Sequence, residues 1–84
     1  MNKIVIIGNS KTCHNCHAAT QYFDAIGETY EYKDLSTDDP IKRIEWKKEA
    51  YSLGIKMIPA IYIDGNPVII GFDEDLINHY LSKR

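Results

Sequence analysis

The chain has 84 residues, which is enough for one domain with a small hydrophobic core. It is 44% hydrophobic and 26% charged with a net charge of −2, values typical of a soluble globular protein. Nothing in this balance indicates a basic surface for nucleic acid, and the longest apolar runs, residues 4–7 and 68–70, are too short for a membrane span or a signal peptide. We therefore expect one domain over residues 1–84, monomeric and cytoplasmic, without nucleic-acid or membrane partners.

The first third of the chain predicts a strand followed by a helix. Residues 3–7 are rich in β-branched apolar side chains, as expected of a strand buried on both faces. A loop over residues 8–12 leads to a helix that begins near Cys13 and ends at Gly27 as its C-cap. The expected inward-facing stripe of this helix has the spacing of one helical face: Cys16, Ala19, Thr20, Phe23 and Ile26.

A second strand and a second helix come next. Residues 29–33 alternate in polarity, which predicts a strand with Tyr30 and Tyr32 on one face. An aspartate cap followed by a proline, at residues 39–40, starts a helix that runs to about Leu53. The expected apolar stripe of this helix is Trp46, Ala50 and Leu53.

The last third predicts a hairpin and a final helix. Residues 59–63 and 67–70 read as strands around the turn at residues 64–66. The final helix is expected over residues 73–82, with the following buried side chains: Leu76, Ile77, Tyr80 and Leu81. The order β-α-β-α-β-β-α predicts an α/β fold in which a four-stranded mixed sheet has helices on both faces.

The cysteines of the chain, Cys13 and Cys16, stand three residues apart at the predicted start of the first helix. At this spacing their Cα atoms are expected to lie about 5–6 Å apart, within disulfide range. A helix N-terminus stabilises an anion, and the thiolate is the reactive form of cysteine. In a reducing compartment, such a pair favours redox chemistry over a structural role. We expect Cys13 to attack a substrate disulfide and the shielded Cys16 to resolve the mixed disulfide.

Three neighbouring residues are candidates for tuning this pair. Lys11 is expected to add positive charge near Cys13, the alternative being a solvated loop lysine. His14 lies between the two sulfurs, where an imidazolium would favour the thiolate, unless it is an exposed helix-start residue without such an effect. His17 is expected to point sideways from the inward stripe and to have less influence.

Residues 13–17 also spell C-H-N-C-H, the pattern of covalent haem attachment. That alternative requires an axial ligand and ordinarily export, whereas the strand-helix-strand context favours a redox disulfide. A structural zinc site takes four ligands from separated pairs, and these two cysteines and two histidines fall within one and a half helical turns. We expect no resident metal, although incidental zinc binding by the two thiolates stays open. A purely structural cysteine pair does not fit an exposed helix start.

Pro59 stands at the first position of the third predicted strand, where a proline is permitted. A cis bond between Ile58 and Pro59 would turn the backbone N–H and C=O of Ile58 outward. Those groups would then be ready to pair with an extended peptide.

On these features the chain resembles the glutaredoxins of the thioredoxin-fold family. The resemblance covers the whole chain and rests on three motifs at the family's spacing. They are the cysteine pair at residues 13–16 after the first strand, Ile58 and Pro59 before the hairpin, and Gly-Phe-Asp at residues 71–73 before the last helix. The resemblance implies a thioredoxin fold with a cis-proline at Pro59 that faces the cysteines.

The resemblance also implies a groove for glutathione or substrate, with these residues: Lys11, Ile58, Pro59, Gly71, Phe72 and Asp73. In it the backbone of Ile58 would pair with the tripeptide. The helix N-terminus at Phe72 and Asp73 would hold the γ-glutamyl end, since backbone N–H groups suit a carboxylate and an aspartate suits an ammonium group. The alternative for Asp73 is a plain N-cap.

The sequence departs from the family's pattern at several of these positions. His14 and Asn15 stand between the cysteines, where the family usually has Pro-Tyr. Met57 and Ile58 stand where Thr-Val is usual before the proline. Ile70 stands where a Gly-Gly pair is common and would narrow the groove. The basic residue that the family often has three positions before the first cysteine is displaced here to Lys11, two positions before Cys13.

The resemblance implies a thiol–disulfide oxidoreductase acting on protein disulfides or glutathione mixed disulfides, with no bound cofactor and with glutathione as co-substrate. Residues 71–72 are also similar to small glutaredoxin-like proteins that the flavoprotein thioredoxin reductase reduces, including electron donors to ribonucleotide reductase. Two further alternatives stay open. One is a binding module in which two chains bridge a 2Fe–2S cluster through Cys13 and glutathione, and the other is an adaptor that has kept only the fold.

Overall fold

The secondary-structure elements follow one another in the predicted order. The computed structural model describes residues 3–83, so the ends of the predicted domain, at residues 1 and 84, lie outside the described residues. The elements in the described part are β1 (Ile4–Gly8), α1 (His14–Ala25), β2 (Glu31–Asp34), α2 (Pro40–Ser52), β3 (Ala60–Ile63), β4 (Ile69–Ile70) and α3 (Glu74–Leu81).

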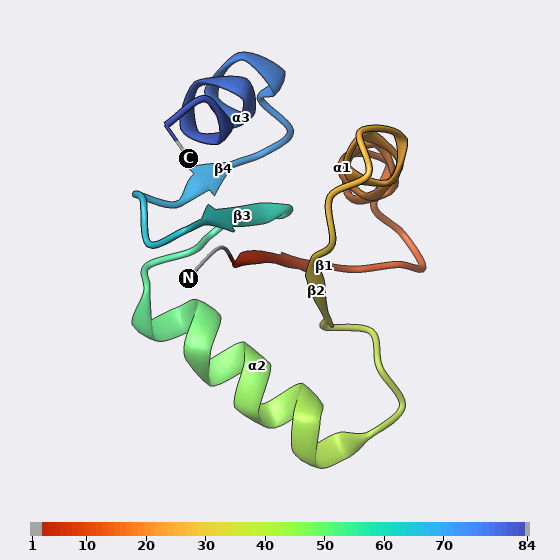
Figure 1. Ribbon diagram of the computed structural model, residues 1–84. Helices are drawn as coiled ribbons and strands as arrows, with labels where there is room; N and C mark the ends of the chain where they lie inside the picture. The colour runs from red at the N-terminus through yellow and green to blue at the C-terminus, as the bar shows by residue number, and fades with distance from the viewer. Residues whose placement is uncertain (1–2, 84) are drawn as a thin grey trace.

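These strands form one mixed sheet in the order β2-β1-β3-β4. β1 runs parallel to β2 and antiparallel to β3, and β4 is antiparallel to β3. Figure 1 shows the sheet nearly edge-on, with α1 and α3 on one side and α2 on the other. The predicted four-stranded mixed sheet with helices on both faces is therefore confirmed.

β1 lies at the centre of the fold, because it pairs on both sides and all 5 of its residues are buried. The predicted burial on both faces is confirmed, although the strand covers residues 4–8 instead of the predicted 3–7. The larger core lies between the sheet and the helices α1 and α3: Ile4, Ile6, Ala19, Phe23, Ile61, Ile63, Ile69 and Ile77. A smaller core under α2 consists of Ile7, Ala50 and Ala60. Burying one large side chain such as Phe23 contributes about 1.5–3 kcal/mol, so the larger core fixes α1 firmly on the sheet.

The second helix begins as the sequence predicts. The carboxylate of Asp39 accepts hydrogen bonds from the backbone N–H groups of Ile41 and Lys42, at 3.0 and 3.2 Å. Pro40 occupies the first helical position, where its missing N–H costs nothing. The predicted cap of aspartate followed by proline is confirmed.

Three side chains that were predicted to face the core are exposed instead. Ile26 and Leu53 are 46% and 49% exposed, and Leu76 is 40% exposed. Ile26 and Leu53 are the C-cap residues of α1 and α2, where the backbone leaves the helix and turns the side chain out of the stripe. The C-cap of α1 is thus Ile26 and not the predicted Gly27, which follows it with a φ of 75°. Leu76 lies in the first turn of α3, beside the buried Ile77, and this short helix covers the sheet with a narrower face than predicted.

The strand limits also differ from the predicted ones. β3 begins at Ala60, and β4 consists of Ile69 and Ile70. Pro59 directly precedes β3, because proline has no N–H to donate to a ladder, and Pro67 lies two residues before β4. β2 begins two residues later and ends one residue later than the predicted 29–33, so Tyr30 lies just outside the strand. Tyr30 and Tyr32 nevertheless both pack against the larger core.

Candidate active site at the start of α1

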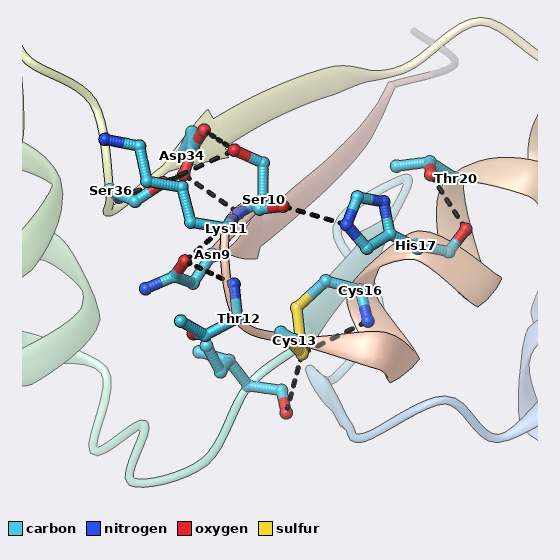
Figure 2. Close-up of a disulfide and its surroundings, with 11 residues drawn as sticks. Asn9, Ser10, Lys11, Thr12, Cys13, Cys16, His17, Thr20, Asp34 and Ser36 are labelled. Atoms are coloured by element: carbon cyan, nitrogen blue, oxygen red, sulfur yellow. Dashed lines mark hydrogen bonds between the residues drawn. A yellow bond between two sulfur atoms is a disulfide. The ribbon is translucent and has the colours of Figure 1, made fainter.

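The two cysteines lie at the N-terminus of α1 and are joined in a disulfide (Figure 2). Their Cα atoms are 5.2 Å apart, and Cys13 is the N-cap residue of the helix. Cys16 is completely buried, whereas Cys13 is half-buried. The structure thus brings the predicted pair together and leaves only Cys13 accessible to a reaction partner.

The sulfur of Cys13 occupies the place of an N-cap acceptor. The backbone N–H of Cys16 donates to Cys13 Sγ across 3.2 Å. When the disulfide opens, the same N–H and the dipole of α1 stabilise a negative charge on this sulfur. The helix start therefore favours Cys13 as the attacking thiolate.

The segment that precedes β3 lies next to the cysteine pair in the folded protein. The peptide bond between Ile58 and Pro59 is cis, which confirms the prediction for this bond. Cys13 Sγ lies 4.0 Å from the carbonyl oxygen of Ile58, 45 residues away in the sequence. Pro59 is completely buried, and Ile58 is half-buried. A peptide that reaches Cys13 would therefore meet the backbone of Ile58.

The predicted binding residues 71–73 follow β4 and are tied to the same segment. The N–H of Gly71 donates to the carbonyl oxygen of Pro59 across 2.7 Å. Phe72 is half-buried, with its ring 5.8 Å from the ring of Tyr22. The carboxylate of Asp73 caps α3 by accepting from the N–H of Leu76 at 3.1 Å. The N-cap role of Asp73 is thus present, and its role toward a ligand stays a prediction.

The loop before Cys13 is organised by Asn9. The side-chain oxygen of Asn9 accepts from the backbone N–H groups of Lys11 and Thr12, at 3.0 and 3.2 Å, and its carbonyl oxygen accepts from the N–H of Cys13 at 3.2 Å. These bonds hold the turn that delivers Cys13 to the helix start.

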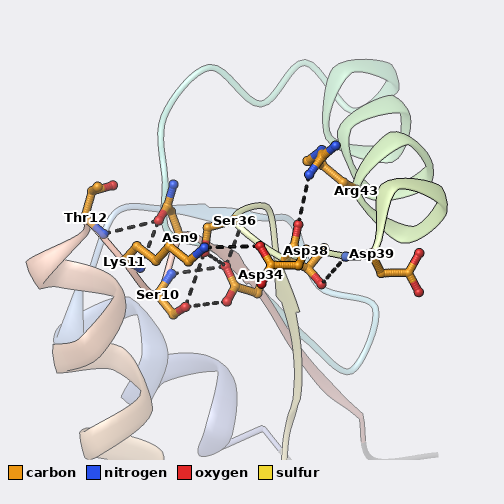
Figure 3. Close-up of polar contacts among 10 residues, drawn as sticks. Asn9, Ser10, Lys11, Thr12, Asp34, Ser36, Asp38, Asp39 and Arg43 are labelled. Carbon is orange, nitrogen blue, oxygen red and sulfur yellow. Dashed lines mark hydrogen bonds and ion pairs between the residues drawn. The ribbon is translucent and has the colours of Figure 1, made fainter.

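Lys11 directs its ammonium group to Asp38, at 3.5 Å (Figure 3). The two side chains are 62% and 98% exposed, so this ion pair contributes little to stability. Figure 2 shows the side chain of Lys11 extending away from the disulfide. An influence of Lys11 on Cys13 stays a prediction, which the Asp38 contact does not favour.

The two histidines of the motif behave differently. His14 is exposed in the first turn of α1. His17 folds back over the loop, and its Nε2 lies 2.8 Å from the carbonyl oxygen of Ser10. Because a carbonyl only accepts, Nε2 is the donor. His17 is expected from the sequence to point sideways with less influence than His14, and its contact with the preceding loop could not be predicted from spacing along a helix.

Asp34, at the end of β2, accepts hydrogen bonds from Ser10 in the loop that precedes Cys13 (Figure 3). Its carboxylate accepts from the N–H of Ser10 at 3.1 Å, from the N–H of Ser36 at 2.9 Å and from both serine hydroxyls. Partial burial acts to raise the pKa of Asp34, but the hydrogen bonds outweigh it and lower the pKa to about 2. Sequence analysis did not identify this network.

No group of three or more His, Cys, Asp and Glu side chains within residues 3–83 is arranged to hold a metal ion. In the zinc alternative, the imidazole of His17 would have to be a ligand, and it is instead bonded to the loop. None of the helices over this same range is long and apolar enough to cross a membrane.

A reducible disulfide at a helix N-terminus, facing a cis-proline on a four-stranded mixed sheet, defines a thiol–disulfide exchange site. A sequence model of the glutaredoxin family matches residues 4–68, and the chain belongs to this family. Members of the family are thiol–disulfide oxidoreductases, so the predicted enzyme class is confirmed. No curated protein sequence is significantly similar to this chain.

Solved structures share the fold. A glutaredoxin from Archaeoglobus fulgidus superposes with a TM-score of 0.81 at 17% identity, over 96% of this chain and 87% of that one. The glutaredoxin-like NrdH-redoxin from Escherichia coli gives 0.74 at 22% identity, over 92% of each chain. A buckwheat glutaredoxin in complex with glutathione gives 0.69 at 22% identity, over 98% of this chain and 72% of that one. At these identities the structures establish the thioredoxin-type fold. The ligands and activities of those proteins are not assigned to this chain by the likeness.

Proposed function

We propose that this protein reduces disulfides by an exchange in which Cys13 attacks and Cys16 resolves. The observation that carries the proposal is the asymmetry of the pair: Cys13 is a half-buried N-cap, and Cys16 is completely buried. The Cys13 thiolate attacks one sulfur of the substrate disulfide, so that a Cys13–substrate bond forms and the other substrate sulfur leaves as a thiolate. Cys16 then attacks Cys13, the Cys13–Cys16 bond forms, and the second substrate sulfur leaves.

In this exchange the substrate disulfide gains two electrons and the cysteine pair loses two. The proton that Cys16 releases is available to the departing thiolate, so no bound cofactor is required. A reductant dithiol, or two molecules of glutathione, would return the pair to the reduced form by the same chemistry in reverse.

We propose an extended peptide segment beside Cys13 as the part of the substrate that is bound. The carbonyl oxygen of Ile58 lies 4.0 Å from Cys13 Sγ, where it can accept from a peptide N–H next to the substrate disulfide. For glutathione, Phe72 and Asp73 would hold the γ-glutamyl end, and Gly71 is tied to Pro59 by a 2.7 Å hydrogen bond between backbone groups.

The second candidate differs in the reductant, which would be a flavoprotein of the thioredoxin-reductase type. Two observations favour it. The Asp73 carboxylate already caps α3, and Ile70 exposes 45% of its surface at the position where it would narrow a glutathione groove. The E. coli NrdH-redoxin of similar fold is a glutaredoxin-like protein with a thioredoxin-like activity profile. Under this second candidate, the protein could act as an electron donor to ribonucleotide reductase.

Two coupled assays on the same protein test the proposal. One supplies glutathione, glutathione reductase and a glutathione mixed disulfide, and the other supplies thioredoxin reductase and insulin, with NADPH consumption measured in both. Cys13→Ser should abolish turnover in both assays. Cys16→Ser should abolish insulin reduction and spare reduction of the small mixed disulfide. A Cys13→Ser protein as active as the wild type would support the inert adaptor instead.

We propose a cytoplasmic location for the protein, because a lone reducible cysteine pair suits a compartment that keeps thiols reduced. Fractionation of cells that produce the chain tests this location. The alternative of a 2Fe–2S module makes a different prediction, visible absorbance after anaerobic purification with glutathione, which a thiol–disulfide oxidoreductase without a cluster would lack.

A further inference from the structure

Gly8, the last residue of β1, leaves room for two reactive side chains from other elements. A Cβ atom at this position would lie 2.6 Å from the hydroxyl oxygen of Tyr32 and 2.7 Å from the sulfur of Cys16. Real Cβ atoms essentially never lie this close to another heavy atom, so any larger residue at this position would force one of these side chains to shift. The hydroxyl from β2 and the sulfur from α1 therefore converge on one point beside β1.

The Tyr32 hydroxyl is available as a hydrogen-bond donor. No hydrogen bond joins this hydroxyl to another residue within the described range 3–83, and the ring packs against the larger core. Burial, together with the nearby charge of Asp34, raises the pKa of Tyr32 to about 12. The phenol thus keeps its proton at every pH at which thiols react.

A hydrogen-bond donor beside Cys16 would stabilise its sulfur whenever that sulfur is a thiolate. The side chain of Cys16 has no exposed surface, and a buried anion is costly unless a hydrogen bond or a charge compensates it. The helix start supports Cys13 rather than Cys16. Among the titratable groups, Cys13 is bonded to the Cys16 sulfur, and Tyr32 of β2 lies across Gly8 from it, with the charge of Asp34 acting on Tyr32. His17 is on the same helix, but its imidazole is bonded to Ser10.

We propose that the Tyr32 hydroxyl donates a hydrogen bond to the Cys16 sulfur when the Cys13–Cys16 bond is open. This inference rests on the proposed exchange and assigns a positioning residue to its second step. In that step the Cys16 thiolate attacks Cys13 while Tyr32 keeps its proton. In the reverse direction, Cys16 leaves Cys13 as a thiolate, and the same hydroxyl receives it.

Stopped-flow reaction of the reduced protein with a nitrothiobenzoate disulfide separates the two steps. Attack by Cys13 releases one coloured thiolate at a rate that depends on reagent concentration, and resolution by Cys16 releases the second at a rate that does not. Tyr32→Phe should leave the first phase unchanged and slow the second about tenfold near neutral pH, since a hydrogen bond to a charged group is lost. The pH at which the second phase reaches half its maximal rate should rise by about one unit.

Tyr30→Phe is the matched control, because Tyr30 packs on the same core and its hydroxyl is bonded to Asp24, at 3.1 Å. It should change neither phase. An unchanged second phase and pH profile in Tyr32→Phe would overturn the role of Tyr32. Equal slowing of the second phase in Tyr32→Phe and Tyr30→Phe would also overturn it, because the effect would then come from altered core packing. Release of only one thiolate by the wild type would instead refute the proposed exchange itself. This failure is seen in the wild type alone, whereas failure of the Tyr32 role is seen only in the variant.

Discussion

His17 Nε2 donates a hydrogen bond to the carbonyl oxygen of Ser10 across 2.8 Å, and so fastens the second turn of α1 to the loop that precedes Cys13. On its other side, Ser10 donates to the Asp34 carboxylate through its N–H and its hydroxyl. The loop is therefore held between α1 and β2. Because Cys13 comes almost directly after this loop, we expect both contacts to help fix the position of its sulfur.

Replacing His17 tests the first contact. His17→Ala should increase amide hydrogen exchange in residues 9–13 and lower the free energy of unfolding by about 1 kcal/mol, the usual contribution of one hydrogen bond. Exchange is measured by mass spectrometry on the oxidised protein. His17→Gln, which retains an N–H donor, should recover part of the protection. Equal exchange in the wild type and His17→Ala would show that the contact does not hold the loop.

Asp34 should make the protein more stable above the range in which its carboxyl titrates. Its pKa in the folded protein is about 2 against an ordinary 3.8, so the stabilisation is complete above pH 3.8 and is lost as the pH falls towards 2. With screening at this partly exposed site, we expect Asp34→Asn to cost about 1–2 kcal/mol at neutral pH.

Urea denaturation at several pH values measures this effect. The difference between the wild type and Asp34→Asn should shrink between pH 3.8 and about 2. Asp38→Asn is the control, since Asp38 is 98% exposed and pairs only weakly with Lys11. A difference for Asp34→Asn that does not change over this range would contradict the account of the carboxylate.

Gly8→Ala should destabilise the protein by about 1–3 kcal/mol, because its methyl group would overlap the Tyr32 hydroxyl and the Cys16 sulfur. Combining it with Tyr32→Phe removes one of the two overlaps. The double variant should therefore lose less stability than the two single losses added together. Thermal unfolding of the four proteins measures this. Additive losses would mean that the hydroxyl and the position of Gly8 do not interact.

The ion pair between Lys33 and Glu49 should matter more than the one between Lys11 and Asp38. Lys33 Nζ lies 2.6 and 2.9 Å from the two oxygens of Glu49 and joins β2 to α2, with side chains 16% and 38% exposed. We expect Lys33→Met to cost about 1 kcal/mol and Lys11→Met less than about 0.5 kcal/mol. Denaturant midpoints of the two variants decide the comparison. Equal losses of unfolding free energy in the two variants would show that the Lys33–Glu49 pair contributes no more than the Lys11–Asp38 pair.

Much of the fold could be predicted from local patterns. The apolar run of β1 and the aspartate-proline start of α2 depend on side chains close in the sequence, and both are confirmed. The exposed Leu53 shows the limit of periodicity, because a stripe does not tell where the backbone leaves the helix.

The candidate site divides in the same way. The pairing of Cys13 with Cys16 could be predicted, because it depends on a spacing of three residues. The convergence of Gly8, Tyr32 and Cys16 could not, because it requires the parallel register of β1 and β2 and the packing of α1 on both. From the sequence alone, a glycine at the end of a strand does not reveal which side chains lie in the space beside it.

The identity of the attacking cysteine is the central claim, and alkylation tests it most directly. The reduced protein is exposed briefly to iodoacetamide at slightly acidic pH, and fragmentation mass spectrometry locates the label. The account predicts labelling of Cys13, with Cys16→Ser labelled at the wild-type rate and Cys13→Ser labelled much more slowly. Preferential labelling of Cys16 in the wild type would contradict it.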